Sequence, residues 1–339
     1  MNYLIRTDVS VEIGTGHIVR CLTLAQALKN KNHKVIFASY QLPKTWQAQL
    51  KASNFEFLEL NDIREIIKLS DKPDFLIVDH YELDAQWEKL MAPHVGKIAV
   101  IDDLANRPHE CDLLLDQNYY LNMEVRYAEL VSKKCKLLLG PTFALLRPEF
   151  YEARKNLKTR DGAVQRLLLF FGGADQAGET TKALRALLEL NKPKLTYDIV
   201  IGSMNPHSRE IQDIMKQLPQ AKLHVQIKNM AELISQADLA LGAGGTATWE
   251  RCFLGLPALT VQVAENQVEM SQALAEKGII QNLGWHQKVS IDDWRSQIRW
   301  AVDNPQELKN MSDRAFEIMG SDGSQVNENH LKLIAFLQK

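Results

Sequence analysis

The sequence predicts an α/β protein made of two doubly wound, Rossmann-like domains. Short apolar runs alternate with helical patterns along most of the chain, the alternation pauses once near residues 148–164, and Gly-rich turns follow strands in both halves. Short buried strands that alternate with helices are typical of parallel sheets with crossover helices. The 339 residues are enough for two such domains. Two domains of this kind in series would face each other across a cleft.

The apolar runs indicate where the strands lie. In the first half we expect strands at Tyr3–Thr7, Lys34–Ser39, Phe55–Leu60, Asp74–Asp79, Lys97–Ile101, Asp112–Leu115 and Lys136–Leu139. In the second half we expect them at Arg166–Phe171, Thr196–Gly202, Leu223–Gln226, Asp238–Gly242 and Pro257–Val261. Ligands of such sheets bind at the carboxyl ends of the strands. The polar residues at those ends in the first half are Asp8, Asp79 to Tyr81, Asp102–Asp103 and Asp116 to Asn118.

A charged stretch marks the domain boundary. Residues 152–162 carry many charges, lack an apolar period and end in the turn signal Asp-Gly. We therefore expect an N-terminal domain at residues 1–150, a linker at 151–164, a C-terminal domain at 165–320 and a terminal helix at 321–339.

Composition argues against several classes of function. The net charge of −2 offers no overall field for nucleic acid, and no apolar run approaches the length of a membrane span. The N-terminus has the pattern of a strand and not of a signal peptide, so we expect a cytoplasmic protein, with a monomer as the simplest assumption. The four cysteines form no Cys-x-x-Cys pair, and Cys21 and Cys252 lie on apolar helix faces, where we expect buried thiols.

The stretch from Ile13 to Arg20, Ile-Gly-Thr-Gly-His-Ile-Val-Arg, joins the first strand to a helix. Gly14 and Gly16 allow a sharp turn and a close approach to a ligand. The helix start offers free N–H groups and a partial positive charge. His17 lies at this start, and Arg20 follows one turn later on the same face. A titratable base next to a cation predicts a reaction site for an anionic ligand, with His17 as the base.

A second turn, Gly242-Ala-Gly-Gly-Thr-Ala-Thr-Trp-Glu250, also follows a strand and begins a helix. Backbone N–H groups at Gly244, Gly245 and Thr246, before Ala247, are candidates for holding a phosphate. The alternative is that the glycines allow close packing of helix on strand. No lysine follows as in a P-loop. Glu250, one turn into the helix, is a candidate for accepting hydrogen bonds from ribose hydroxyls, or for a contact with the helix dipole.

Two further places at strand ends are candidates. Gly173, in Phe171-Gly-Gly-Ala-Asp175, lies in another strand-to-helix turn and is a candidate for nucleotide binding, or belongs to a plain turn. Tyr81 and His80 end a strand of the first half, where one of them would orient a sugar, unless both are ordinary polar strand ends. The histidines show no metal-ligand spacing and the chain has no Asp-x-Asp triplet, so we expect neither a metal nor a cofactor.

These motifs occur together, in this order, in one family. The chain resembles the UDP-2,4-diacetamido-2,4,6-trideoxy-β-L-altropyranose hydrolases of bacterial pseudaminic acid synthesis. The resemblance runs from the first strand to about residue 320, and it includes Ile101 to Arg107 and Gly140 to Arg147. It implies a GT-B fold and metal-free release of UDP from the anomeric carbon. It also implies that His17 is the catalytic residue, that UDP binds at Gly244–Ala247 and Glu250, and that Asn266 contacts the diphosphate or the sugar.

The chemistry agrees with this resemblance. A glycosidase needs two carboxyl groups, one of which protonates a poor leaving group. Diphosphate is stable as an anion without that proton, so one base that activates water suffices, and attack opposite UDP predicts inversion. Three rival hypotheses remain at this point: a UDP-sugar glycosyltransferase on the same fold, a nucleotide-sugar-binding protein without catalysis, and an NAD-dependent dehydrogenase.

Overall fold

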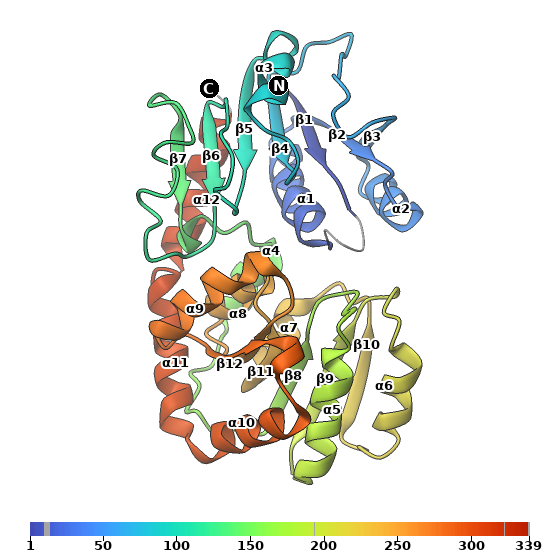
Figure 1. The fold of residues 1–339 in the computed structure, drawn as a ribbon, viewed down its shortest axis with the longest axis vertical. Coiled ribbons are helices and arrows are strands. Elements are labelled where there is room, and N and C mark those ends of the chain that lie inside the picture. The colour runs from blue at the N-terminus through green and yellow to red at the C-terminus, as the bar shows by residue number, and fades with distance from the viewer. Residues whose placement is uncertain (10–13, 193, 322, 338–339) are drawn as a thin grey trace. The chain divides into compact units, whose positions relative to one another are not determined.

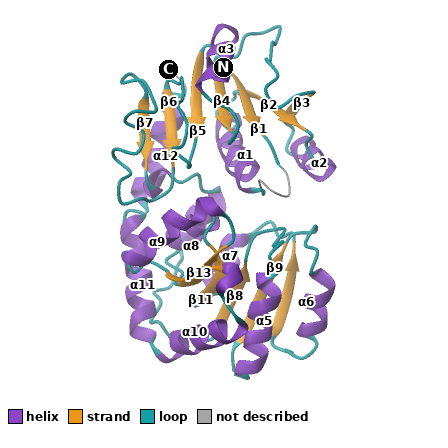
Figure 2. Cartoon of the chain, viewed as in Figure 1, coloured by secondary structure: helices purple, strands orange, loops and turns teal. Residues whose placement is uncertain are grey.

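The structure, a computed structural model, describes residues 1–9, 14–192, 194–321 and 323–337, so Ile13 of the first Gly-rich stretch lies outside the described residues. The chain divides into two units (Figure 1). The first comprises Met1–Leu145 together with the C-terminal residues from Val326 onward, and the second comprises Leu146–Gln325. Both units alternate strands and helices along the chain (Figure 2).

Among the described residues, the first unit contains a seven-stranded sheet in which all neighbouring strands are parallel. The strand order reverses between β1 and β4, which makes this the switch point where ligands of such sheets bind. In spatial order the strands are β3 (Glu56–Leu60), β2 (Lys34–Tyr40), β1 (Asn2–Thr7), β4 (Phe75–Asp79), β5 (Lys97–Ile101), β6 (Leu113–Asp116) and β7 (Lys136–Leu139).

Helices cover both faces of this sheet, because its strands are apolar on both sides. Helix α1 (Gly16–Lys29) buries Ile18 and Leu24 in the same cluster as Ile5. Helices α2 (Lys44–Ala52) and α12 (Ser324–Phe336) contribute to this cluster too. Helix α3 (Ala85–Met91) packs on the opposite face, where Trp87 is buried in the same cluster as Leu4. Short 3-10 turns η1 (Ala92–His94) and η2 (Pro141–Phe143) complete this unit's helical segments in the described chain.

The second unit contains a sheet of six parallel strands within the described residues. Its switch point lies between β8 and β11. In spatial order the strands are β10 (Ala221–Val225), β9 (Thr196–Ile201), β8 (Arg166–Phe170), β11 (Leu239–Ala243), β12 (Ala258–Gln262) and β13 (Gln281–Trp285). The helical segments are α4 (Pro148–Lys155), α5 (Glu179–Leu190), α6 (Ser208–Met215), α7 (Met230–Gln236), α8 (Ala247–Phe253), η3 (Glu265–Gln267), α9 (Val268–Glu276), η4 (His286–Lys288), α10 (Ile291–Asp303) and α11 (Pro305–Ile318).

The prediction of two doubly wound α/β domains is confirmed. The boundaries differ from those expected from the sequence. Part of the expected linker forms α4, which packs against α7 and α8. Arg160, later in the same stretch, donates to the carbonyls of Ala237 (3.0 Å) and Ile234 (2.8 Å), and so binds the segment to the second unit. The terminal helix packs with the first unit through Leu333 and Ile334.

One strand of the second sheet was missed from the sequence. β13 contains Asn282 and Gly284, and all of its residues are only half-buried at the sheet edge, so it lacks a buried apolar run. In the described part of the chain, no helix combines the length and the hydropathy that a membrane span requires.

Candidate active site

The first Gly-rich turn brings His17 to the end of β1, beside the end of β4. Gly14 has φ +78°, a backbone conformation that favours glycine, and Gly16 is the first residue of α1. His17 is therefore placed by the helix start, and only 4% of its surface is exposed. β1 and β4 are neighbours, with Thr7 directly opposite Asp79.

Asp79 orients the His17 ring. The Nδ1 atom of His17 lies in a short contact with Asp79 Oδ1, and Asp79 is fully buried. Arg20 donates to both oxygens of the same carboxylate, from Nε to Oδ2 at 2.7 Å and from Nη2 to Oδ1 at 2.6 Å. Because ionised Asp79 can only accept, His17 Nδ1 carries the ring proton and donates it to the Asp79 carboxylate. The lone pair of the His17 ring then lies on Nε2. Among the described residues, no hydrogen bond to Nε2 is found.

The charge on Asp79 is secured by its neighbours. Burial alone would raise the pKa of Asp79, but the charges and hydrogen bonds of Arg20 and His17 hold it far below its ordinary range. The carboxylate therefore remains ionised at neutral pH. Arg20 itself is buried, and burial, which would lower its pKa, is outweighed by Asp79 and Asp103, so its pKa is raised.

Tyr81 and Asp103 extend this group. Tyr81 places its ring edge-on to the His17 imidazole, with the ring centroids 4.4 Å apart. Burial, together with a hydrogen bond to Asp103, raises the pKa of the Tyr81 hydroxyl. Asp103 also accepts from Arg20 Nη1 at 3.1 Å, so it connects Tyr81 to the Arg20–Asp79 pair. The structure thus brings together His17, Arg20 and Tyr81, all predicted from the sequence. Asp79 and Asp103 complete the group, although the sequence identified them only as polar strand ends.

A second buried Asp–His–Arg group lies at the end of β1 and has a different character. Asp8 is held by Arg6 and accepts from His80 Nε2 at 2.9 Å. His80 Nδ1 accepts from the backbone N–H of Glu82 at 3.0 Å, so both ring nitrogens of His80 are occupied. This group orders the strand end, and of the two candidate residues Tyr81 is the one beside His17.

Buried carboxyls also line the ends of β5 and β6, which the sequence flagged only by position. The Tyr127 hydroxyl oxygen lies 3.0 Å from Asp102 Oδ2 and 3.0 Å from Asp116 Oδ2, so its single proton is shared between the two carboxyls. Burial, and to a smaller extent the charge of Asp103, raises the pKa of Asp116 to about 7. Asp116 is therefore a buried carboxyl that titrates near neutral pH.

In the second unit, the turn after β11 lies at the switch point. The N–H of Gly244 donates to the Val261 carbonyl at 3.1 Å. This N–H is therefore not available to a phosphate, contrary to the expectation from the sequence. A Cβ at Gly244 would lie 2.3 Å from Ser271 Oγ, so a larger residue here would have to displace the Ser271 hydroxyl. Within the described chain, the N–H groups of Gly245 and Thr246 have no hydrogen-bond partner, and Ala247 begins α8.

Glu250 is held beside this turn. Its Oε1 accepts from Arg147 Nη2 at 3.1 Å, and Arg147 also lies 3.2 Å from Glu149. Burial raises the pKa of Glu250, and the Arg147 charge partly offsets this effect. An Arg-supported carboxylate of this kind has a second oxygen with which to accept hydroxyl hydrogen bonds.

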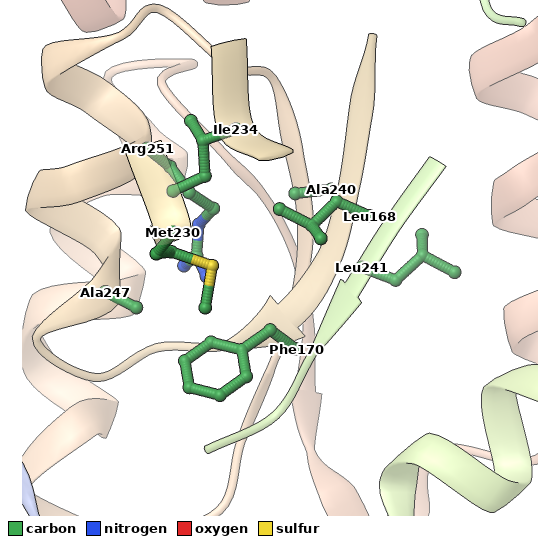
Figure 3. Close-up of a pocket in the computed structure, with 8 residues that line it drawn as sticks. All are labelled: Leu168, Phe170, Met230, Ile234, Ala240, Leu241, Ala247 and Arg251. Atoms are coloured by element: carbon green, nitrogen blue, oxygen red, sulfur yellow. The ribbon is translucent and has the colours of Figure 1, made fainter. Parts of the chain in front are cut away.

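A buried cation supports the turn from behind. Arg251 is 3% exposed and donates to the Ala243 carbonyl at 2.9 Å and to Thr248 Oγ1 at 3.0 Å. Among the described residues, no carboxylate forms an ion pair with Arg251. Figure 3 shows its side chain beside a small apolar pocket that is also lined by Met230 and Phe170. Burial lowers the pKa of Arg251. No motif in the sequence indicated that this residue is buried behind the turn.

Gly173 and Asn266 complete the predicted positions in this unit. The Gly173 carbonyl accepts from the N–H of Gly202 at 2.8 Å, and a Cβ at Gly202 would lie 2.6 Å from that oxygen. Asp175 closes the same turn by accepting from the N–H groups at the start of α5. Asn266 lies in η3, between β12 and α9. Among the described residues, no group of three His, Cys, Asp or Glu side chains is arranged to hold a metal ion.

Comparison with known proteins defines the class. Residues 167–326 match the glycosyltransferase family 28 C-terminal domain. The crystal structure of MurG from Acinetobacter baumannii aligns with a TM-score of 0.62 at 13% identity, and the alignment covers 98% of this chain and all of that one. Two doubly wound units with this likeness are the fold of GT-B nucleotide-sugar enzymes.

Sequence relatives narrow the class to a family. UDP-2,4-diacetamido-2,4,6-trideoxy-β-L-altropyranose hydrolase from Campylobacter jejuni is 31% identical over 282 residues, which are 82% of this chain and 97% of that protein. The chain belongs to the family of this hydrolase. An uncharacterized protein from Methanocaldococcus jannaschii is 26% identical over 79% of this chain, which spans 57% of that protein's length.

Proposed function

We propose that the protein is a metal-independent hydrolase of UDP-2,4-diacetamido-2,4,6-trideoxy-β-L-altropyranose. Water attacks the anomeric carbon, UDP leaves, and the product is 2,4-diacetamido-2,4,6-trideoxy-L-altrose with inverted anomeric configuration, for pseudaminic acid synthesis. Membership of the hydrolase family supports the substrate. The observation that carries the catalytic role is the contact of His17 Nδ1 with buried Asp79, which assigns the lone pair of the ring to Nε2.

In this mechanism, His17 Nε2 takes a proton from the attacking water. Asp79 orients the ring and stabilises the imidazolium as it forms. Asp79 does not take the proton itself, because Arg20 and His17 hold its pKa far below neutrality. Asp79, Asp103 and Arg20 together carry a formal charge of −1, so protonation of His17 makes the group neutral.

We assign UDP recognition to the second unit. The N–H groups of Gly245 and Thr246, with Ala247 behind them, would bind the diphosphate and the negative charge that grows on it during cleavage. Glu250, supported by Arg147, would accept hydrogen bonds from the ribose. Gly244 would contribute by close packing, since its own N–H is donated to Val261.

The remaining assignments rest on position in the sequence. Gly14 and Gly16 would admit the sugar close to His17, and Tyr81 and Arg20 would border it. Gly173 would border the nucleotide, and Asn266 would contact the diphosphate or the sugar. A diphosphate leaving group needs no protonation, so this scheme requires no second catalytic acid.

A glycosyltransferase is the second candidate, because residues 167–326 match a glycosyltransferase domain. The test is to incubate the purified protein with the UDP-diacetamido-trideoxy sugar without any acceptor, and to follow UDP and the sugar by NMR. The hydrolase proposal predicts stoichiometric UDP and free sugar, the latter appearing first as the anomer opposite to that of the substrate. UDP release that requires an added acceptor would instead support a transferase, and tight binding with no release would support a binding protein.

A further inference from the structure

Two of the cysteines, far apart in sequence, lie side by side in the first unit. Cys111 Sγ and Cys135 Sγ are 3.6 Å apart, and both side chains are partly exposed. Cys111 lies just before β6 and Cys135 directly before β7, at the edge of the sheet opposite to the strand ends that carry His17 and Asp79. The other cysteines, Cys21 and Cys252, are buried.

The backbone holds the two thiols in reach of each other. The N–H of Lys136 donates to the Asp112 carbonyl at 2.9 Å, so the residues that follow the two cysteines are hydrogen-bonded. Leu113 pairs with Lys136 in the parallel register of β6 and β7. The 3.6 Å between the two sulfurs shows that both side chains point toward each other, and a disulfide needs only a further closing of this distance to about 2 Å.

The two sulfurs are also chemically distinct. The hydrogen bond that Cys135 receives from Cys111 lowers the pKa of Cys135, and the same interaction, with burial, raises the pKa of Cys111. A hydrogen bond from the Leu114 backbone lowers the pKa of Cys135 further, whereas burial and the charges of Asp112 and Glu88 act in the opposite direction. Cys135 is therefore the better nucleophile, and Cys111 is placed as the resolving thiol.

We propose that Cys111 and Cys135 form a thiol–disulfide exchange site that takes low-molecular-weight disulfides such as oxidised glutathione. The Cys135 thiolate attacks one sulfur of the oxidant, a mixed disulfide forms, and one glutathione thiolate leaves. The Cys111 thiolate then attacks Cys135 Sγ, the protein disulfide forms, and the second glutathione thiolate leaves. Two protein thiols are oxidised and one glutathione disulfide is reduced to two thiols.

The disulfide would close a covalent loop around the segment that supports the candidate active site. This segment contains Tyr120, which donates to the Asp103 carbonyl at 2.8 Å, and Tyr127, whose hydroxyl lies within hydrogen-bond distance of Asp102 and Asp116. Closing a loop of this length restricts the unfolded chain and stabilises the fold. The oxidised protein should therefore unfold at a temperature higher by roughly 5–10 °C.

The test equilibrates the full-length protein in buffers of reduced and oxidised glutathione, alkylates the remaining thiols and maps the products by peptide mass spectrometry. We expect one intramolecular disulfide that links Cys111 to Cys135, while Cys21 and Cys252 are alkylated only after unfolding. The thermal transition should rise in oxidising buffer, and this rise should vanish in the Cys135→Ser variant.

The Cys111→Ser variant provides the matched control. It should accumulate glutathione on Cys135, because the resolving thiol is missing, whereas Cys135→Ser should leave Cys111 as a free thiol. The proposal is overturned if the wild type forms no such link in oxidising buffer, if both cysteines end as mixed disulfides, or if the link forms without any rise in the unfolding temperature.

Discussion

Replacing Asp79 by Asn tests how the His17 base is prepared. In the wild type, Asp79 Oδ1 faces both His17 Nδ1 and Arg20 Nη2, and Oδ2 accepts from Arg20 Nε at 2.7 Å. An Asn whose oxygen keeps the bond to Arg20 Nε would place its amide NH₂ against His17 Nδ1 and also against Arg20 Nη2, whose hydrogen bond is lost. Nδ1 must then accept, which moves the ring proton to Nε2 and removes the lone pair that takes the proton from water.

The magnitude follows from these contacts. Loss of a positioned base in the wrong tautomer should lower turnover by about 10²–10⁴-fold, or roughly 3–5 kcal/mol in the barrier. The Asp79→Asn change breaks the buried ion pair with Arg20, but Arg20 still has Asp103 as a partner at 3.1 Å. The unfolding free energy should therefore fall by about 3 kcal/mol, near the lower limit for breaking a buried ion pair. The ordinary pKa of 3.8 is lowered in the folded state, so the carboxylate's stabilisation is complete above about pH 4 and is lost in stronger acid.

The assay compares UDP release per folded molecule with UDP binding and thermal unfolding. Asp8→Asn is the matched control, because Asp8 is also buried between an arginine and a histidine, Arg6 and His80, but His80 has both ring nitrogens occupied. Asp8→Asn should lose similar stability and keep turnover within severalfold. Turnover of a folded Asp79→Asn variant within a few fold of the wild type would refute the reasoning.

Three further predictions concern other buried groups. Arg251→Met should weaken UDP binding roughly tenfold without changing uridine binding, because a buried cation behind the turn favours only the charged ligand. Calorimetric titration of both ligands, with Arg251→Lys as the control, checks this prediction. Equal losses of affinity for UDP and for uridine would contradict it. Gly244→Ala should lower the unfolding free energy by about 1–3 kcal/mol, since its Cβ would lie 2.3 Å from Ser271 Oγ, and a second change, Ser271→Ala, which removes that oxygen, should restore most of it in denaturant unfolding. The pKa of Asp116 is raised from 3.8 to about 7, so between these pH values the folded state keeps a proton that the unfolded chain has lost, and stability falls as pH rises, by up to about 4 kcal/mol. Thermal unfolding of wild type and Asp116→Asn from pH 4 to pH 8 should show this slope only in the wild type, and parallel profiles would contradict it.

The sequence predicted most of the fold because the strands are buried on both faces and appear as continuous apolar runs. β13 could not be found in this way, since Asn282 and Gly284 interrupt an edge strand that is only half-buried. α4 carries the charges of an expected linker, and its docking on α7 and α8 depends on tertiary packing. Residues 326–337 pack with the first unit through contacts distant in sequence, such as that of Tyr3 with Leu337.

The candidate site could be predicted only in part for a similar reason. His17, Arg20 and Tyr81 follow from local motifs and from the rule that ligands bind at strand ends. The partnership of His17 with Asp79 requires β1 and β4 to be neighbours, which a chain read in order does not specify. The donation of the Gly244 N–H to Val261 likewise depends on the β11–β12 register.

The most direct test of the proposed function compares wild type with His17→Asn on the UDP-diacetamido-trideoxy sugar without acceptor, with UDP binding and UDP release both measured. The proposal predicts UDP release with inversion by the wild type, and unchanged UDP affinity with turnover lowered at least about a hundredfold in the variant. Near-normal turnover by His17→Asn, or no UDP release by the wild type, would contradict it.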